Sequence, residues 1–461
     1  MSGTFEQLDV PPTLVSFAVT TGKVQEIVSP EFKEAGHPVY LLECEKTADG
    51  LPVPDALIRL FGTVHALTAS GTAKAVYTPG DGGIAEAVFK MGLGNQIGFA
   101  FDDSWSIQDL FGYRYGSFVV ETDRPVENAR LLGYTAKDSL TYGGKALSLK
   151  ALQDLWEGKL EPVYACNIDQ SGRPMETFTH QADSWPAPAV ITRKPTFVIP
   201  AFPGTNCEID SARAVEDAGA KAEIVVIRNL TADDVARSVD RMQAALRRAQ
   251  VLFVPGGFSG GDEPDGSGKF ITAFFRNEVL REETEQLLYA RDGLALGICN
   301  GFQALIKLGL VPFGHILPAD AAAPTLTFNT IARHQSRLVR TRVASNKSPW
   351  LRFTNAGDIF TVPISHGEGR FLADEETIRS LAANGQIATQ YVDLNGQPTS
   401  DIRFNPNDSM YAIEGITSPD GRVLGKMGHS ERTGAGLYKN VPGRYDMKLF
   451  DAAVHYFGGD N

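Results

Sequence analysis

Cysteines are few in this sequence, and long apolar runs are absent. The four cysteines, Cys44, Cys166, Cys207 and Cys299, are widely separated in a chain of 461 residues. They do not form the framework of a small disulfide-stabilised protein, so we expect a reducing, cytoplasmic setting. No stretch of about 18 consecutive apolar residues occurs, and no membrane-spanning helix is expected. The first residues, MSGTFEQLDVPPTLVSFAV, lack the basic and apolar regions of a signal peptide.

An excess of positive charge is absent as well. The chain has 43 Lys and Arg residues against 55 Asp and Glu residues, which gives a formal net charge of −12 at pH 7. This balance argues against nucleic acid or an anionic membrane surface as a partner. It does not exclude a small anionic substrate, which needs only a few local donors. A hydrophobic content of 43% with 21% charged residues is typical of a soluble globular protein.

Length and a change in composition predict two domains. A chain of 461 residues is too long for one ordinary core. Residues 170–202 are first polar and proline-bearing and then turn into the apolar segment TFVIPAF, which places a boundary near residue 195. The predicted domains are therefore residues 1–195 and 196–461.

The second domain has the pattern of an α/β fold. Strands are predicted at 197–202, 222–227, 251–254 and 294–297, and helices at 208–218, 232–248 and 270–290. Strands that alternate with helices of this length indicate a parallel sheet with right-handed crossovers. In such a sheet the functional site lies at the carboxyl ends of the strands. The loops FPGTNCE, PGGFSGGDE and GICNGFQ all fall at such ends.

The first domain is less regular and is predicted to be α+β. A strand is expected at 13–19, and the apolar stretch 56–67 is consistent with a helix or with mixed structure. Gly82 and Gly83 are followed by apolar residues at helical spacing, which predicts a turn that opens an amphipathic helix. The segment IGFAF, residues 97–101, is predicted to be a strand.

The segment around Cys299 carries the strongest chemical signal. An apolar strand runs into Gly297-Ile-Cys-Asn-Gly301 and then into a helix, the pattern of a nucleophile elbow. Small residues two before and two after the cysteine permit the tight turn, and the helix N-terminus favours the thiolate. The N–H of Asn300 is then available to stabilise an oxyanion. The alternative is a buried core cysteine, and this pattern alone does not decide between them.

Two histidines compete for the role of general base. His429 follows a predicted strand at 422–427, and Glu431 lies two residues further on. Side chains two apart on an extended segment point the same way, about 6.6 Å apart, so the carboxylate can fix the imidazole tautomer. His366 has the same spacing to Glu368, and a surface pair in a solvated turn is the alternative for both. Spacing alone does not choose between the histidines.

Five ordered motifs, FPGTNCE, PGGFSGGDE, GICNGFQAL, SHGEGRF and MGHSER, carry a resemblance to a known family. Over residues 196–461 the sequence resembles the class I (triad) glutamine amidotransferases, which have a flavodoxin-like fold. It is most similar to the glutaminase domain of phosphoribosylformylglycinamidine synthase. The resemblance implies that Cys299 is the nucleophile, His429 the base and Glu431 the carboxylate that orients the base.

The same resemblance implies further roles around the nucleophile. Gly257 and the N–H of Asn300 would form the oxyanion hole, and Gln303 and the His366 loop would help to hold glutamine. Glutamine hydrolysis needs no cofactor in this family. In the complete synthase, ATP and Mg²⁺ drive the conversion of formylglycinamide ribonucleotide to the amidine with ammonia from glutamine. Those steps need further synthetase domains or subunits as partners.

For the other loops, a structural role is a simpler interpretation than a catalytic or ligand-binding one. Cys207 lacks the small residues of an elbow, so we expect a capping loop that supports the site. Residues 261–270 lack the G-x-x-x-x-G-K-[ST] pattern and are expected to form a loop over the site. His366 and Glu368 have no third ligand nearby, and no metal site is predicted. The sequence FSGG, residues 258–261, departs from the family at Gly260, where an aromatic residue is common, so a local loop difference is expected.

The first domain resembles, through TPGDGGIAEAVFKMGLGN, the C-terminal type of domain of the aminoimidazole ribonucleotide synthetase-like superfamily. Asp81, Gly82 and Gly83 are thereby implied to face a nucleotide or phosphate, with a plain helix-capping turn as the alternative. The chain then corresponds to a portion or separate subunit of the larger synthase. Three alternatives stay open: the glutaminase of another class I amidotransferase, a cysteine hydrolase or peptidase of the same architecture, and a subunit that is silent without its partner.

Overall fold

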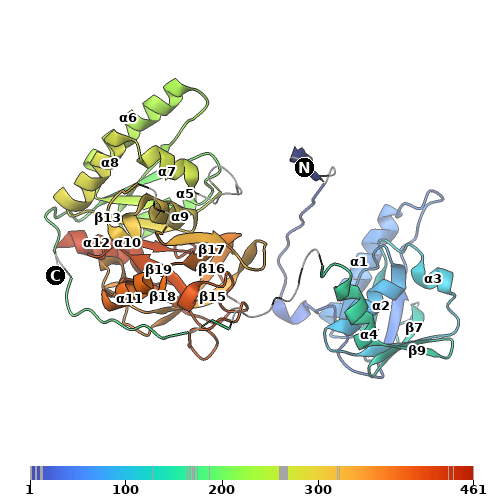
Figure 1. Cartoon of the computed structure of the whole chain (residues 1–461). Helices are drawn as coiled ribbons and strands as arrows, with labels where there is room; N and C mark the ends of the chain where they lie inside the picture. Colours follow the sequence, from blue (N-terminus) through green and yellow to red (C-terminus); the bar gives the residue numbers. More distant parts are fainter. Residues whose placement is uncertain are drawn as a thin grey trace. The chain divides into compact units, whose positions relative to one another are not determined.

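The computed structural model divides the chain into two compact units, residues 1–167 and 168–461. It describes residues 3–5, 8–10, 14–127, 129–162, 165, 168, 172–173, 175–185, 187–258, 268–318, 320, 322–434, 436–439 and 441–459. Figure 1 shows both units, each with its own sheet and helices.

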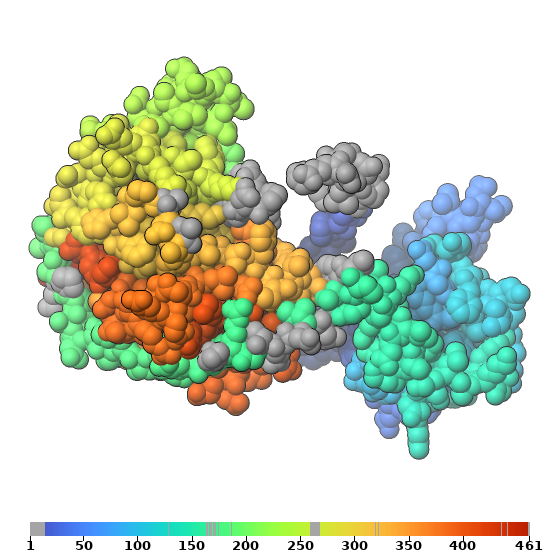
Figure 2. Space-filling view, in the orientation of Figure 1, coloured from blue at the N-terminus to red at the C-terminus, as the bar shows by residue number. Residues whose placement is uncertain are grey.

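The division between the units falls earlier than the predicted boundary near residue 195. Residues 175–185 and 187–195, drawn in green in Figures 1 and 2, run as an extended segment along the second unit. The N–H of Phe178 donates to Gln390 Oε1 at 3.0 Å, and the N–H of His180 donates to Ala344 O at 2.8 Å. The N–H of Thr192 donates to Phe457 O at 2.8 Å. These bonds make the polar, proline-bearing stretch part of the second unit instead of a linker.

The second unit contains a mixed sheet of nine strands. Its strand order is β11-β10-β12-β13-β20-β19-β18-β15-β16. The first five strands are parallel: β10 (Thr196–Ala201), β11 (Lys221–Val226), β12 (Val251–Val254), β13 (Leu294–Ile298) and β20 (Val423–Lys426). In chain order these strands read 2-1-3-4-5, the order of the flavodoxin-like fold. The predicted parallel sheet is therefore confirmed for this half.

The other half of that sheet is antiparallel, which the sequence analysis did not predict. It consists of β15 (Gln335–Val343), β16 (Ile359–His366), β18 (Ile387–Tyr391) and β19 (Ile413–Thr417). A separate antiparallel pair is formed by β14 (Thr325–Phe328) and β17 (Glu368–Leu372). These strands carry the segment around His366 and the strand that precedes β20.

Helices cover the sheet of the second unit (Figure 1). They are α5 (Glu208–Asp217), α6 (Ala232–Arg248), α7 (Lys269–Phe275), α8 (Glu278–Glu285), α9 (Asn300–Leu308), α10 (Leu310–Phe313), α11 (Glu375–Ala383) and α12 (Leu449–Gly458), with short helical turns at Gln286–Ala290, Pro349–Leu351 and Met410–Ala412. The single helix predicted at 270–290 is wrong, because α7 ends and Asn277 Oδ1 accepts the N–H of Val279 at 3.0 Å to start α8. None of the helices in the described ranges has the length and apolar character that crossing a membrane requires.

The first unit is α+β, as predicted. Its seven-stranded sheet has the order β4-β6-β3-β7-β5-β8-β9, and only β5 and β8 pair in parallel. The strands are β3 (Pro38–Leu42), β4 (Ala73–Tyr77), β5 (Gly98–Phe101), β6 (Phe118–Thr122), β7 (Arg130–Ala136), β8 (Ser139–Tyr142) and β9 (Lys145–Ser148), and β1 (Gly3–Phe5) pairs with β2 (Leu8–Val10) apart from them. The helices are α1 (Pro54–Ala69), α2 (Gly83–Leu93), α3 (Ile107–Phe111) and α4 (Leu149–Gly158), with a short turn at Val24–Glu26.

The strand predicted at 13–19 is wrong over its described part. Residues 14–19 have no regular structure, and the side chain of Leu14 is 91% exposed. The apolar alternation of this segment therefore has no neighbouring strand to pair with in the described structure. Residue 13 lies outside the described ranges.

The predicted glycine turn opens α2. Gly83 has φ +66°, and a Cβ there would lie 2.6 Å from Gly112 O, so the turn needs a glycine. The N–H of Gly82 donates to Glu86 Oε2 at 2.6 Å, and Asp81 Oδ1 accepts from the Tyr115 hydroxyl. A carboxylate thus already occupies the N-terminal end of α2, where a phosphate would otherwise be favoured. This geometry favours the helix-capping interpretation over a phosphate site.

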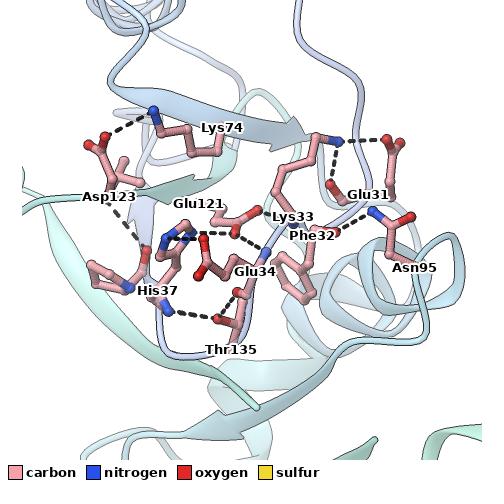
Figure 3. Close-up of polar contacts among 12 residues, drawn as sticks. Glu31, Phe32, Lys33, Glu34, His37, Lys74, Asn95, Glu121, Asp123 and Thr135 are labelled. Carbon is pink, nitrogen blue, oxygen red and sulfur yellow. Dashed lines mark hydrogen bonds and ion pairs between the residues drawn. The ribbon is translucent and has the colours of Figure 1, made fainter. Parts of the chain in front are cut away.

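Glu121 on β6 anchors a loop of the first unit (Figure 3). Its side chain is fully buried, and its two oxygens accept the N–H of Lys33 at 2.9 Å and the N–H of Glu34 at 3.3 Å. His37 Nδ1 lies 2.8 Å from Glu121 Oε1, and the N–H of His37 donates to Thr135 Oγ1 at 2.8 Å. The buried carboxylate therefore ties residues 33–37 to the sheet.

A buried ion pair fixes the segment that follows β20 in the second unit. Lys426 Nζ lies 3.1 Å from Glu414 Oε1, and both side chains are 0% exposed. Lys426 Nζ also donates to Gly428 O at 2.9 Å and to Ser430 Oγ at 3.0 Å. The N–H of Gly428 donates to Glu414 Oε1 at 2.6 Å. The pair thereby holds residues 428–430 against β19 and β20.

Replacing one partner of this ion pair should destabilise the protein strongly. Lys426→Met leaves Glu414 as an uncompensated buried charge, which costs about 3–5 kcal/mol in the free energy of unfolding. Urea unfolding of the second-unit transition measures the loss. Arg237→Met is the matched control, because Arg237, which pairs with Asp233 and Asp234, is 64% exposed and should contribute less than about 1 kcal/mol. Equal losses for the two variants would contradict this account.

Candidate functional site

Cys299 occupies a strained turn between β13 and α9. Its φ is +51° and its ψ is −106°, a backbone conformation that residues other than glycine rarely adopt. The N–H of Cys299 donates to Lys426 O at 2.9 Å, which continues the pairing of β13 with β20 beyond the strand ends. The turn predicted at this position is confirmed, and it places the cysteine at the carboxyl end of a central parallel strand.

The two flanking glycines are required by close backbone approach. A Cβ on Gly297 would lie 2.6 Å from Leu305 Cδ1, and a Cβ on Gly301 would lie 2.0 Å from Val254 O. The first helical turn of α9 therefore packs directly against β12 and β13. Small residues two before and two after Cys299 are a steric requirement of this turn, as the sequence analysis expected.

The Cys299 thiol is almost completely buried. Its Sγ lies 3.7 Å from Ser365 O, on the segment before His366. Burial raises the pKa of the Cys299 thiol, and the nearby Cys207 and Glu431 raise it further. The N–H of Asn300 and the charge of Arg432 oppose this rise in pKa without overcoming it. The start of α9 therefore favours the thiolate, as expected, but burial outweighs this effect and the thiol needs a base to accept its proton.

His429 and Glu431 form a buried pair. His429 Nδ1 lies 2.7 Å from Glu431 Oε1, and the N–H of His429 donates to Pro363 O at 2.9 Å. Burial opposes ionisation of Glu431, but the charge and the hydrogen bond of His429 hold its pKa below the usual value. In the described part of the chain, His429 Nε2 has no hydrogen-bond partner. The ring therefore has one nitrogen held by a carboxylate and the other available to accept a proton.

His366 lies at the same site but in a different electrostatic setting. Neither ring nitrogen has a hydrogen-bond partner within the described ranges. Burial lowers the pKa of His366 to about 3, and the nearby His429 and His334 contribute to the shift. His366 is thus a neutral ring without the carboxylate contact that His429 makes. Geometry distinguishes the two histidines where sequence spacing did not.

A small pocket adjoins the Cys299 thiol and encloses about 10 Å³ of free space. It is lined by Gly257, Phe258, Cys299, Gln303, Ser365, His366, Gly367 and Glu368. Gln303 Nε2 donates to Glu368 O at 2.9 Å, and Asn300 Nδ2 donates to Gln303 Oε1 at 3.0 Å. The Gln303 amide therefore joins α9 to β17 in this closed site. Its predicted contact with glutamine stays a prediction.

Gly257 brings two of the sequence motifs together. Its φ is +141°, and a Cβ there would lie 2.7 Å from Thr205 Cα. The N–H of Phe258 donates to Gly204 O at 2.8 Å, so the PGGF loop lies directly against the GTNCE loop. Residues 259–267, which include Gly260 and most of the predicted loop over the site, lie outside the described residues.

Cys207 contacts the His429–Glu431 pair, which was not predicted from the sequence. Cys207 Sγ lies 3.9 Å from His429 Nδ1, and Arg432 Nη2 donates to Cys207 Sγ at 3.0 Å. Burial and the nearby Glu431 raise the pKa of the Cys207 thiol to about 11. Cys207 is the N-terminal capping residue of α5, as expected of a capping loop, although its side chain makes no capping hydrogen bond. The position of FPGTNCE at the carboxyl end of β10 was the feature of the sequence that could have indicated this contact.

Alanine at position 301 tests the steric requirement of the turn. Because its Cβ would lie 2.0 Å from Val254 O, Gly301→Ala should lower the free energy of unfolding by at least about 1–3 kcal/mol. Gly458→Ala is the control, since no atom lies within 4 Å of a Cβ there. Urea unfolding measures the free energy of unfolding of both variants. A Gly301→Ala protein as stable as Gly458→Ala would refute the packing described for α9.

Comparison with known proteins places the second unit in a family. Residues 194–457 match the family of CobB/CobQ-like glutamine amidotransferase domains. Phosphoribosylformylglycinamidine synthase subunit PurQ of Methanococcus maripaludis is 36% identical over 251 residues, covering 53% of this chain and 84% of that protein. The PurQ subunit of Salinibacter ruber is 32% identical over 261 residues, covering 56% and 96%.

Among solved structures, PurLQS from Thermotoga maritima is similar at 24% identity with a TM-score of 0.41, covering 57% of this chain and 99% of that one. The sequence matches fall on the unit that carries Cys299, His429 and Glu431, so the family assignment and the site concern the same residues. The chain belongs to the family of CobB/CobQ-like glutamine amidotransferases, together with the PurQ subunits of phosphoribosylformylglycinamidine synthase.

Proposed function

We propose that this chain hydrolyses glutamine at Cys299 and supplies ammonia to a phosphoribosylformylglycinamidine synthase. One observation carries the proposal: in a chain of the PurQ family, a buried cysteine on a nucleophile elbow lies at the end of the strand next to a histidine–glutamate pair. The ammonia converts formylglycinamide ribonucleotide to its amidine in purine biosynthesis.

In the first step, Cys299 attacks the side-chain amide carbon of glutamine. Its raised pKa means that the proton must leave as the S–C bond forms, and His429 Nε2 accepts it. Glu431 accepts the hydrogen bond from Nδ1–H and stabilises the imidazolium that results. The Cys299–His429–Glu431 arrangement is supported by the burial of all three side chains, which strengthens their electrostatic coupling.

The carbonyl oxygen of glutamine becomes an oxyanion in this step, and backbone donors stabilise it. The N–H of Asn300, which already lowers the pKa of the Cys299 sulfur, is one donor. Gly257, which lines the same pocket as Cys299, supplies the second N–H. Gln303 and the His366 loop, which line this pocket, hold the glutamine.

Collapse of the tetrahedral intermediate breaks the C–N bond and leaves a glutamyl thioester on Cys299. His429 gives its proton to the departing nitrogen, so ammonia leaves as a neutral molecule. The same histidine then takes a proton from water, which attacks the thioester. Glutamate is released, and His429 returns the proton to the departing Cys299 sulfur, which regenerates the thiol.

The closed site supports control of this activity by a partner. A free space of about 10 Å³ has room for roughly one water molecule and none for the side chain of glutamine. Lining residues must therefore move before substrate binds. We infer that association with the synthetase portion favours the open arrangement, which couples ammonia release to the presence of an acceptor.

The first unit is assigned in this proposal to the synthetase portion, as a domain of the aminoimidazole ribonucleotide synthetase-like type. Its α+β architecture and the glycine turn before α2 support that assignment. The carboxylate of Glu86 at this turn does not suit a phosphate, so ATP and Mg²⁺ are assigned to the remaining synthetase domains or subunits. The proposed setting of the reaction is the cytoplasm.

Cys299→Ala should abolish glutamine hydrolysis and glutamine-dependent amidine formation. Amidine formation from added ammonium salts should persist with the synthetase portion present, because that step does not use Cys299. Glutamine hydrolysis and amidine formation are both measured with and without the synthetase portion. Cys44→Ala, which removes a buried thiol from the first unit, is the matched control and should retain glutamine-dependent activity. Hydrolysis of glutamine by Cys299→Ala at the parent rate would overturn the assignment.

Separate alanine variants of the two histidines should give different kinetic defects. His429→Ala removes the proton acceptor, so kcat for glutamine should fall by about 10²–10⁴ and no thioester should accumulate. His366→Ala leaves the His429–Glu431 pair intact and should mainly raise KM. Steady-state kinetics with the synthetase portion separates the two effects. If His366→Ala carried the larger loss of kcat, the roles would have to be exchanged.

A further inference from the structure

A second thiol lies against the proposed base. Ligand atoms of Cys207, His429 and Glu431 all lie within 4.8 Å of one another. The distance from Cys207 Sγ to His429 Nδ1 is 3.9 Å, and that from His429 Nδ1 to Glu431 Oε1 is 2.7 Å. All three side chains are buried, and Glu431 Oε2 has no hydrogen-bond partner in the part of the chain that the structure describes.

The fold brings this cluster together from two distant segments of the chain. Cys207 follows β10, whereas His429 and Glu431 follow β20. Gly256, after β12, leaves the space between them: a Cβ there would lie 2.7 Å from His429 Cε1 and 3.2 Å from Cys207 Sγ. The thiol can approach the Nδ1 side of the ring because position 256 has no side chain.

A thiolate, an imidazole and a carboxylate are ligands that zinc prefers, whereas magnesium prefers oxygen ligands. Tetrahedral zinc with bonds of about 2.0–2.3 Å places its ligand atoms about 3.5 Å apart. The observed separations of 3.9 and 2.7 Å differ from this by less than about 1 Å, which small side-chain rotations can supply. Three protein ligands and one water would complete the coordination.

We propose that Cys207, His429 and Glu431 bind a zinc-type divalent cation and that this binding switches the glutaminase off. The cation bonds to the Cys207 sulfur, to His429 Nδ1 and to a Glu431 oxygen. The thiol proton is released to solvent, and the ring proton of His429 is transferred from Nδ1 to Nε2. Nε2 then carries a hydrogen and cannot accept the proton of Cys299. The inhibitory part rests on the proposed role of His429, whereas the cation site does not.

Arg432 fits this arrangement through its contact with Cys207. Its Nη2 lies 3.0 Å from the Cys207 sulfur and can continue to donate to the sulfur after the thiol proton has left. Such a donor around a metal-bound sulfur orients the ligand and stabilises its negative charge. Because all three ligands are buried, the cation needs the same opening of the site as glutamine does.

Binding of Co²⁺, a spectroscopic substitute for Zn²⁺, tests the site without reference to activity. The full chain carrying Cys166→Ser and Cys299→Ala retains only Cys44 and Cys207 as thiols. It should bind one equivalent of Co²⁺ with a sulfur-to-cobalt charge-transfer band that Zn²⁺ displaces and Mg²⁺ does not. Adding Cys207→Ser should remove the band, and adding the matched Cys44→Ser should not. Absence of the band, or its persistence without Cys207, would overturn the site.

Inhibition is measured on the chain with all its cysteines, together with the synthetase portion. Zn²⁺ should stop glutamine hydrolysis, and a chelator should restore it. In Cys207→Ser, the Zn²⁺ concentration for half-inhibition, relative to that variant's own metal-free rate, should rise at least about 10-fold. A Cys207-dependent cobalt band without inhibition would overturn the switch. Failure of the proposed function is distinct, because it appears as no glutaminase activity before any metal is added.

Discussion

The strained turn at Cys299 is the constraint around which the second unit is arranged. A positive φ at a cysteine is unfavourable, and it persists because neighbouring elements leave the backbone no alternative. Gly301 packs against Val254 O on one side, and the N–H of Cys299 donates to Lys426 O on the other. The central strands β12, β13 and β20 thus converge on one residue. The strain exposes the sulfur to the pocket at the end of the sheet while the backbone stays buried.

The antiparallel half of the sheet completes the site. β16 is the edge strand in sheet order, yet Pro363 O accepts the N–H of His429 and Ser365 O lies 3.7 Å from Cys299 Sγ. β19 supplies Glu414, whose buried pair with Lys426 fixes the backbone just before His429. Parallel strands therefore present Cys299 and His429, and antiparallel strands hold His429 and close the pocket over the Cys299 thiol.

Much of the parallel half could be predicted from the sequence, because its signals are local. The helix at 232–248 agrees with α6 at both ends, and a Cβ on Gly297 would lie 2.8 Å from Gly301 C within the same turn. The break between α7 and α8 depends on a single capping residue, Asn277, inside a continuous amphipathic pattern.

The antiparallel strands and the contact of Cys207 with His429 depend on pairing between distant segments, which periodicity does not encode. The sequence offered two H-x-E pairs and could not rank them by spacing. The structure separates them physically, since His429 contacts Glu431, whereas the ring of His366 has no such contact among the described residues.

The identity of the nucleophile is the central claim, because a second buried thiol, Cys207, lies 3.9 Å from His429 Nδ1. Peptide mapping by mass spectrometry of the protein quenched in acid during turnover of glutamine, with the synthetase portion present, locates the glutamyl thioester directly. The account predicts the adduct on the peptide that contains Cys299 and none on the peptide that contains Cys207. An adduct on Cys207, or turnover without any thioester on Cys299 in a rapid-quench time course, would contradict it.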